Sequence, residues 1–100
     1  MGLSTMNAFA LKITVKRIEK MEKYYDTLKS GINASPPKIN RKMLKKLLKY
    51  YEGGQWLKDY EADEKGLLPS KLKRGVLSED GVYDLLTEIQ AAEHKISKSE

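Results

Sequence analysis

The strongest constraint on the fold is a row of apolar residues, spaced three and four apart, in the first third of the chain. The row consists of Leu11, Val15, Ile18, Met21, Tyr25, Leu28 and Ile32. This spacing places the side chains along one face of an α-helix. Pro36 and Pro37 cannot continue the helix, because proline lacks the amide hydrogen and clashes with the preceding turn. We therefore predict a helix from about Asn7 to Ile32.

A second helix is predicted to begin near Asn40, whose side chain can accept a hydrogen bond from a free amide of the first turn. Its apolar face is formed by Ile39, Met43, Leu44, Leu47, Leu48 and Tyr51. The helix is expected to end at Gly53 and Gly54, where the backbone can adopt a positive φ at little cost. A short loop between two such helices favours an antiparallel hairpin.

Two shorter elements are predicted next. Gln55 to Lys65 is expected to form a short helix that ends at Gly66, and residues 70–75 are expected to form a turn or a helical fragment.

The last helix has a clear start signal. Ser78 is predicted to be its N-cap, and Glu79 and Asp80 place negative charge in the first turn, where the helix dipole favours it. Leu77 would then pack against Val82 across the cap. The inward face is formed by Val82, Leu85, Leu86 and Ile89.

These segments predict an all-α fold, because no stretch shows the alternation that is typical of a strand. We expect an antiparallel helical hairpin packed against a short tryptophan-bearing helix and a C-terminal helix, in a small helical bundle. The chain, residues 1–100, is expected to form one domain, with fraying of residues 1–6 and 94–100.

Composition argues against several classes of site. The chain has no cysteine and one histidine, His94, so disulfides, thiol chemistry and a multi-histidine metal site are not expected. No apolar run approaches the length that spans a membrane, and the start of the chain lacks the features of a secretory signal. We therefore expect a cytoplasmic protein with no metal and no cofactor.

The acidic residues Asp59, Glu61, Asp63 and Glu64 begin like a calcium-binding loop. With Asp59 as position one, however, the sixth position is Glu64 instead of glycine, and the twelfth is Ser70 instead of a bidentate glutamate. We therefore predict a solvated acidic face, which could dock onto the lysines. No pair of acids or serine-centred motif indicates catalysis, so no enzyme is expected.

A lysine-rich segment is the strongest indication of nucleic-acid binding. It consists of Arg41, Lys42, Lys45, Lys46 and Lys49. These side chains could contact successive phosphates of a nucleic acid, and Tyr50 or Trp56 could stack on an unpaired base. The alternative, which we favour, is an ordinary charged helix face, because no known nucleic-acid-binding motif accompanies the lysines. A membrane-surface role for this segment ranks lower, since its apolar face is needed for the core.

Two further features have alternative interpretations. Trp56 is interpreted as a core anchor between the hairpin and the C-terminal part, in preference to a platform for a ligand. Lys73 and Arg74 could present two cations to an acidic partner. We favour local ion pairs for them, with acids such as Glu79 or Asp80.

The second half of the chain carries a recognisable order of residues. A tyrosine pair at Tyr50 is followed by Gly53, Trp56 and Asp59, then by Leu68-Pro69 and by Leu72-Lys73-Arg74-Gly75-Val76-Leu77-Ser78-Glu79-Asp80. This order resembles a family of short bacterial proteins, mainly Gram-positive, that is known as a domain of unknown function. The resemblance implies a compact helical fold in a bacterial cytoplasm and transfers no activity, ligand or catalytic residue.

Charge is divided unevenly along a chain of net charge +5, with 13 basic and 4 acidic residues up to Lys58 and 6 basic and 10 acidic after it. Either the two parts attract each other within one fold, which we favour, or the basic part binds nucleic acid.

We expect a non-enzymatic protein that acts through contacts with another protein, as an adaptor, accessory or inhibitor. The alternative is a nucleic-acid-binding accessory protein that uses the lysine-rich second helix. The near-heptad spacing of the first apolar row supports either a homodimer through this helix or pairing with the second helix of the same chain. No membrane partner is expected.

Overall fold

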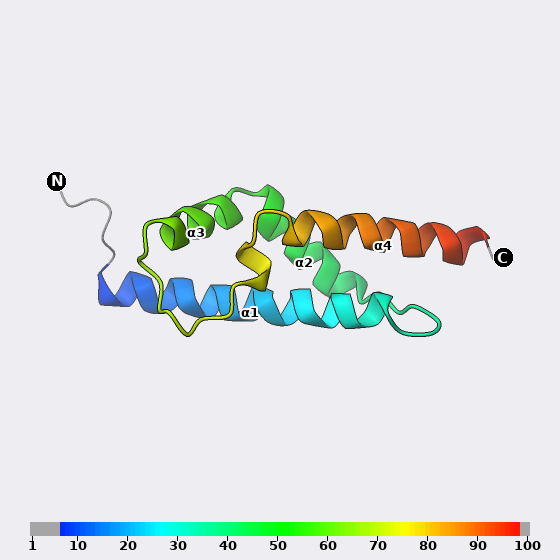
Figure 1. Ribbon diagram of the computed structural model, residues 1–100, viewed down its shortest axis with the longest axis horizontal. Helices are drawn as coiled ribbons and strands as arrows, with labels where there is room; N and C mark the ends of the chain where they lie inside the picture. Colours follow the sequence, from blue (N-terminus) through cyan, green and yellow to red (C-terminus); the bar gives the residue numbers. More distant parts are fainter. Residues whose placement is uncertain (1–6, 99–100) are drawn as a thin grey trace.

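The computed structural model describes residues 7–98, and the side chains up to residue 94. Its longest element is α1 (Ala8–Ile32), which lies along the long axis of a molecule measuring 58 × 19 × 19 Å (Figure 1). Asn7 is the N-cap of α1, because its side chain accepts a hydrogen bond of 2.7 Å from the amide of Ala10. The predicted first helix is confirmed at both ends.

The next two helices are also where the sequence predicts them. The N-cap of α2 (Arg41–Glu52) is Asn40, whose side chain accepts from the amide of Met43 at 3.1 Å. After the glycine pair, α3 (Gln55–Glu64) begins at once, because Gly54 adopts a φ of 95° that permits a sharp bend between the two helices. In Figure 1, α2 runs back across α1, as expected for a helical hairpin.

The start of the last helix differs from the prediction. Ser78 is not an N-cap, because its hydroxyl donates to the carbonyl of Gly75 and closes a short 3₁₀ helix, η1 (Gly75–Leu77). The final helix, α4 (Gly81–Lys98), begins three residues later, and the carbonyl of Asp80 accepts from the amide of Asp84 at 2.8 Å. Glu79 and Asp80 therefore precede the first turn, and Asp84 is its acidic residue.

The expected fraying of residues 94–100 stays a prediction. Residues 94–98 continue α4, so the helix extends to Lys98. Residues 1–6 and 99–100, which were also expected to fray, lie outside the described residues.

The core lies between α1 and the elements that pack on it, which are α2, η1 and α4. Ile18 and Leu28 of the predicted apolar row are buried, together with Leu47 of α2. The described residues contain no strand, and the fold is all-α. The buried hydrophobic core is formed by Ile18, Tyr25, Leu28, Leu47, Tyr50, Ala62, Leu68, Val76, Leu77, Val82, Leu85 and Ile89.

Packing within the chain therefore uses the apolar row of α1. Of the two alternatives for this row, pairing inside one chain is the one that the structure shows. A homodimer through α1, which stays a prediction, would have to use the opposite face of the helix.

Candidate interaction surfaces

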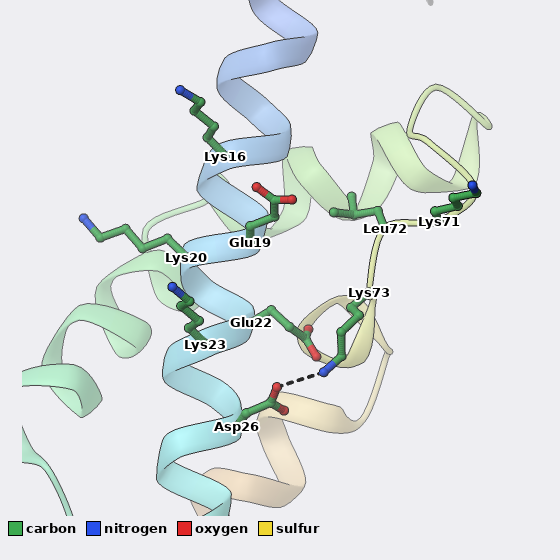
Figure 2. A pocket seen from close by; sticks show the side chains of 9 residues that line it. All are labelled: Lys16, Glu19, Lys20, Glu22, Lys23, Asp26, Lys71, Leu72 and Lys73. Carbon is green, nitrogen blue, oxygen red and sulfur yellow. Dashed lines mark hydrogen bonds and ion pairs between the residues drawn. The ribbon is translucent and has the colours of Figure 1, made fainter.

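A groove of about 540 Å³ lies between α1 and the connection that leads from α3 to η1 (Figure 2). Figure 2 shows that Glu19, Glu22 and Asp26 point from α1 towards this connection, whereas Lys16 and Lys20 extend to the other side of the helix. The groove is lined by Lys16, Glu19, Lys20, Glu22, Lys23, Asp26, Lys71, Leu72 and Lys73.

Two carboxylates of this groove hold the connection against α1. Asp26 forms an ion pair with Lys73 at 3.2 Å. Glu22 is 6% exposed and accepts a hydrogen bond of 2.8 Å from the amide of Val76. A Cβ atom at Gly75 would lie 2.8 Å from the carboxylate of Glu22, so the glycine permits this close approach. Both acids thus bind the connection, which leaves Glu19 as the carboxylate of the groove that takes part in no ion pair among the described residues.

A buried ion pair connects α1 to α3. Asp59 is 2% exposed and accepts two hydrogen bonds from Arg17, at 3.0 Å from Nε and 2.7 Å from Nη2. It also accepts from the hydroxyl of Tyr50 at 2.7 Å and from the side-chain amide of Gln55 at 3.3 Å. The prediction of a solvated acidic face is therefore wrong for Asp59. Its charge is paired and hydrogen-bonded, as buried charges require.

The contacts with Asp59 change the pKa values of Arg17 and Tyr50. The hydrogen bond to Asp59 raises the pKa of Arg17 above its ordinary value, against the opposing effect of burial. Burial and the hydrogen bond to Asp59 raise the pKa of Tyr50 far above its ordinary value. Both groups thus keep their protons at physiological pH, and the cluster fixes α1, α2 and α3 relative to one another. Tyr50 is 5% exposed, so it cannot stack on a nucleic-acid base.

Arg74 forms hydrogen bonds that hold the connection from α3 to η1 in a folded conformation. Its Nε atom donates to Asp63 at 2.6 Å, and its other nitrogens donate to the carbonyls of Pro69 and Leu72, both at 2.7 Å. Ser70 provides a third carbonyl acceptor at 3.3 Å. The expected ion pairs of Lys73 and Arg74 with Glu79 or Asp80 are wrong. Their partners are Asp26 and Asp63, because the connection folds back against α1 and α3.

Trp56 joins α3 to η1 from a half-buried position. Its indole N–H donates to the carbonyl of Val76 at 2.8 Å. Its ring stacks on Tyr60 with centroids 5.0 Å apart and meets the Tyr51 ring edge-on at 5.2 Å. The hydroxyl of Tyr60 donates to Glu79, and this bond raises the pKa of Tyr60. These contacts support the interpretation of Trp56 as an anchor.

The lysines of α2 form an exposed face. We define the α2 lysine face as Lys42, Lys45, Lys46 and Lys49, which are all exposed. The ammonium group of Lys46 lies 6.0 Å from the ring of Tyr24 on α1. Arg41, which the sequence groups with these lysines, is also exposed but forms an ion pair with Glu93 of α4.

A shallow groove of about 380 Å³ lies beside this face, at the junction of α1, α2 and α3. Met21 and Gly53 line it, and Lys46 and Lys49 contribute to its wall. The α2 lysine face therefore combines positive charge with a neighbouring surface that is largely apolar.

Within the described residues, no group of three histidine, aspartate or glutamate side chains is arranged to hold a metal ion. No helix in the described part of the chain is both long enough and apolar enough to cross a membrane.

The order of residues in the second half of the chain can now be compared with known proteins. A family described as a domain of unknown function, DUF4298, matches residues 18–97. The chain belongs to this family. Comparisons with curated proteins and with solved structures gave no match. The family region includes both partners of the Arg74–Asp63 pair and of the Trp56–Val76 hydrogen bond, whereas Arg17 lies one residue before it.

Proposed function

We propose that this protein is a non-enzymatic helical adaptor, accessory or inhibitor that binds an acidic segment of another protein through the α2 lysine face. The observation that carries this proposal is the position of the four lysines on one exposed side of α2, where the ion pairs of the described residues do not use them.

The adjacent groove favours a protein partner. Lys46 and Lys49 stand beside Met21 and Gly53, so a ligand that reaches the lysines can also cover apolar surface. A peptide segment with acidic and apolar side chains matches this combination, because complementary charge speeds encounter and apolar contact adds affinity. The phosphate backbone of a nucleic acid would contact only the lysine charges and would leave the apolar surface uncovered.

The roles of the acids support a non-enzymatic function. Asp59 and Glu22 are buried and hydrogen-bonded, and Asp26 and Asp63 are paired with basic side chains. General acid–base catalysis would require a carboxylate that faces a substrate and can exchange its proton there. The buried carboxylates are instead used to hold the helices and the connection together.

The test is affinity capture with purified protein at moderate salt, comparing the native chain with the variant Lys42→Glu/Lys45→Glu. We expect a partner that the native chain retains and the variant loses, with binding of the purified partner weakened at least about tenfold. The charge-matched control is Lys58→Glu/Lys65→Glu, whose lysines are exposed on α3 and just after it. Equal retention by all three proteins, or retention of no partner, would refute the proposal.

A second candidate function is nucleic-acid binding by the same face. The spacing of Lys42, Lys45, Lys46 and Lys49 along one helix favours it, since such a row can follow successive phosphates. It predicts a gel shift of an oligonucleotide that weakens steeply as salt rises and is lost in the Lys42→Glu/Lys45→Glu variant. No shift at low salt would exclude this candidate.

A further inference from the structure

The side of α1 that points away from the core carries two exposed apolar side chains. Phe9 is 73% exposed and Ile13 is 46% exposed, although the helix buries Ile18 and Leu28 almost completely. Residues four apart are neighbours on a helix surface, so Phe9 and Ile13 form one apolar patch near the start of α1.

Lysines surround this patch on the same side of the helix. At about 100° per residue, Lys12, Lys16, Lys20 and Lys23 fall within the same arc of roughly 100° as Phe9 and Ile13. All four are exposed, and none belongs to an ion pair among the described residues. We define the α1 outer face as Phe9, Lys12, Ile13, Lys16, Lys20 and Lys23.

We propose that the α1 outer face binds the surface of a membrane that contains anionic lipids. Apolar side chains among lysines on one side of a helix are typical of helices that lie in the lipid headgroup region. Phe9 and Ile13 enter this region, while the lysines contact lipid phosphates, to which polybasic segments are attracted.

The shape of the molecule fits a flat surface. The axis of α1 follows the long dimension of a body measuring 58 × 19 × 19 Å, so one side of the helix can lie along the bilayer (Figure 1). Figure 2 shows Lys16 and Lys20 extending away from the connection that carries Lys71 and Lys73.

This proposal changes an expectation drawn from the sequence. No membrane partner was expected, because the apolar face of the lysine-rich residues 41–52 is needed for the core. Phe9 and Ile13 lie on a different helix and outside the core, so the argument does not apply to them. The proposal concerns binding at the surface, and it is independent of the function proposed for the α2 lysine face.

The test is co-sedimentation of the full chain with vesicles of phosphatidylcholine alone and of phosphatidylcholine mixed with phosphatidylglycerol. We expect binding to the mixed vesicles only. Because each lysine near an anionic surface contributes about fivefold to partitioning, Lys16→Glu/Lys20→Glu should weaken binding at least about 25-fold. Phe9→Ser/Ile13→Ser should weaken it about tenfold or more, since it removes the apolar contribution.

Matched controls separate this face from general effects. Lys58→Glu/Lys65→Glu changes the net charge equally, and Leu57→Ser/Tyr83→Ser replaces exposed apolar residues of α3 and α4. Both controls should bind mixed vesicles within about threefold of the native chain. A Phe9→Trp variant should also show a blue shift of its emission on binding, because the indole moves into the headgroup region.

Three outcomes would overturn the proposal. The first is no binding to mixed vesicles at low salt, which would leave the α1 outer face to a protein partner. The second is binding that the Phe9→Ser/Ile13→Ser variant retains in full, which would indicate charge attraction alone. The third is equal weakening by the Lys58→Glu/Lys65→Glu control, which would show that the location of the lysines is irrelevant.

Discussion

Arg17 and Asp59, which lie 42 residues apart in the chain, form a two-point ion pair with nitrogen–oxygen distances of 2.7 and 3.0 Å. The carboxylate of Asp59 is 2% exposed, whereas the Arg17 side chain is 26% exposed. The two partners should therefore respond differently to substitution, because only the arginine can turn towards water.

We expect Arg17→Met to lower the free energy of unfolding by about 3 kcal/mol, because it leaves Asp59 as a buried charge without its cation. Asp59→Asn should cost less, about 1–2 kcal/mol, since Arg17 regains solvent. Urea denaturation measures both values. The double variant should be less destabilised than the sum of the two changes. Strict additivity would contradict a direct interaction.

Stability should fall at high pH because of Tyr50. Its pKa is raised by burial and by the hydrogen bond to Asp59, so the folded state keeps the phenolic proton after the unfolded state has lost it. The stabilisation is complete below the ordinary tyrosine pKa of about 10 and is lost as pH rises above it, by about 1.4 kcal/mol per pH unit. Urea denaturation at a series of pH values gives this slope.

The control for the pH effect is Tyr50→Phe. It should be less stable than the native chain at neutral pH, because it removes a donor from buried Asp59, but its stability should decline less steeply above about pH 10. Identical slopes for the two proteins would show that other groups dominate the alkaline loss of stability.

Replacement of Trp56 should separate its ring from its hydrogen bond. Trp56→Phe keeps an aromatic ring beside Tyr60 but removes the donor to the Val76 carbonyl, and we expect a loss of about 1 kcal/mol. Trp56→Ala should cost about 3 kcal/mol, since the half-buried ring is lost as well. Thermal or urea unfolding measures both changes.

The neighbouring residue Leu57 supplies the control for Trp56. It is 51% exposed, so Leu57→Ala should change stability by less than about 0.5 kcal/mol. If Trp56→Ala also had so small an effect but abolished capture of a partner, Trp56 would belong to an interface and not to the scaffold.

Arg74→Lys should loosen the connection between α3 and η1. Arg74 serves Asp63 and three carbonyls through several nitrogens, and a lysine ammonium cannot match this planar arrangement. We expect a loss of about 1–2 kcal/mol and faster amide hydrogen exchange at residues 70–77. Lys73→Arg is the conservative control, because its ion pair with Asp26 is exposed. Unchanged amide hydrogen exchange at residues 70–77 in Arg74→Lys would show that Arg74 does not hold this connection in place.

The helices were predictable because their signals are local. Asn7 and Asn40 act as caps within their own first turns, and the glycine pair after α2 permits the bend into α3. The start of α4 was mispredicted for a reason that is also local. The hydroxyl of Ser78 can accept a hydrogen bond from the first turn of the following helix, or it can donate one back to the carbonyl of Gly75. The packing of η1 favours the bond to Gly75.

The polar contacts between helices were not predictable in the same way. Glu22 lies among apolar core positions of α1, but its acceptor role depends on Val76, which is 54 residues away. The signal that could have been used is the interruption of an apolar face by Thr14 and Glu22, since a polar residue at such a position needs an internal partner. The partner's identity comes only from the tertiary fold.

The exposed lysines of α2 were identified from spacing alone, because charged side chains opposite an apolar face remain on the surface. The same logic did not reveal the α1 outer face, where Phe9 and Ile13 interrupt the lysines and do not belong to the core row. Their exposure becomes evident only when every neighbouring element has been placed.

The inner and outer positions of α1 have no residue in common. Ile18 and Glu22 face the elements that α1 organises, while Lys16 and Lys20 face outward, so selection can alter one set without disturbing the other. A lineage that carries this helix can therefore acquire, retune or lose an external ligand by surface changes alone, at little cost to the interior that keeps the chain folded.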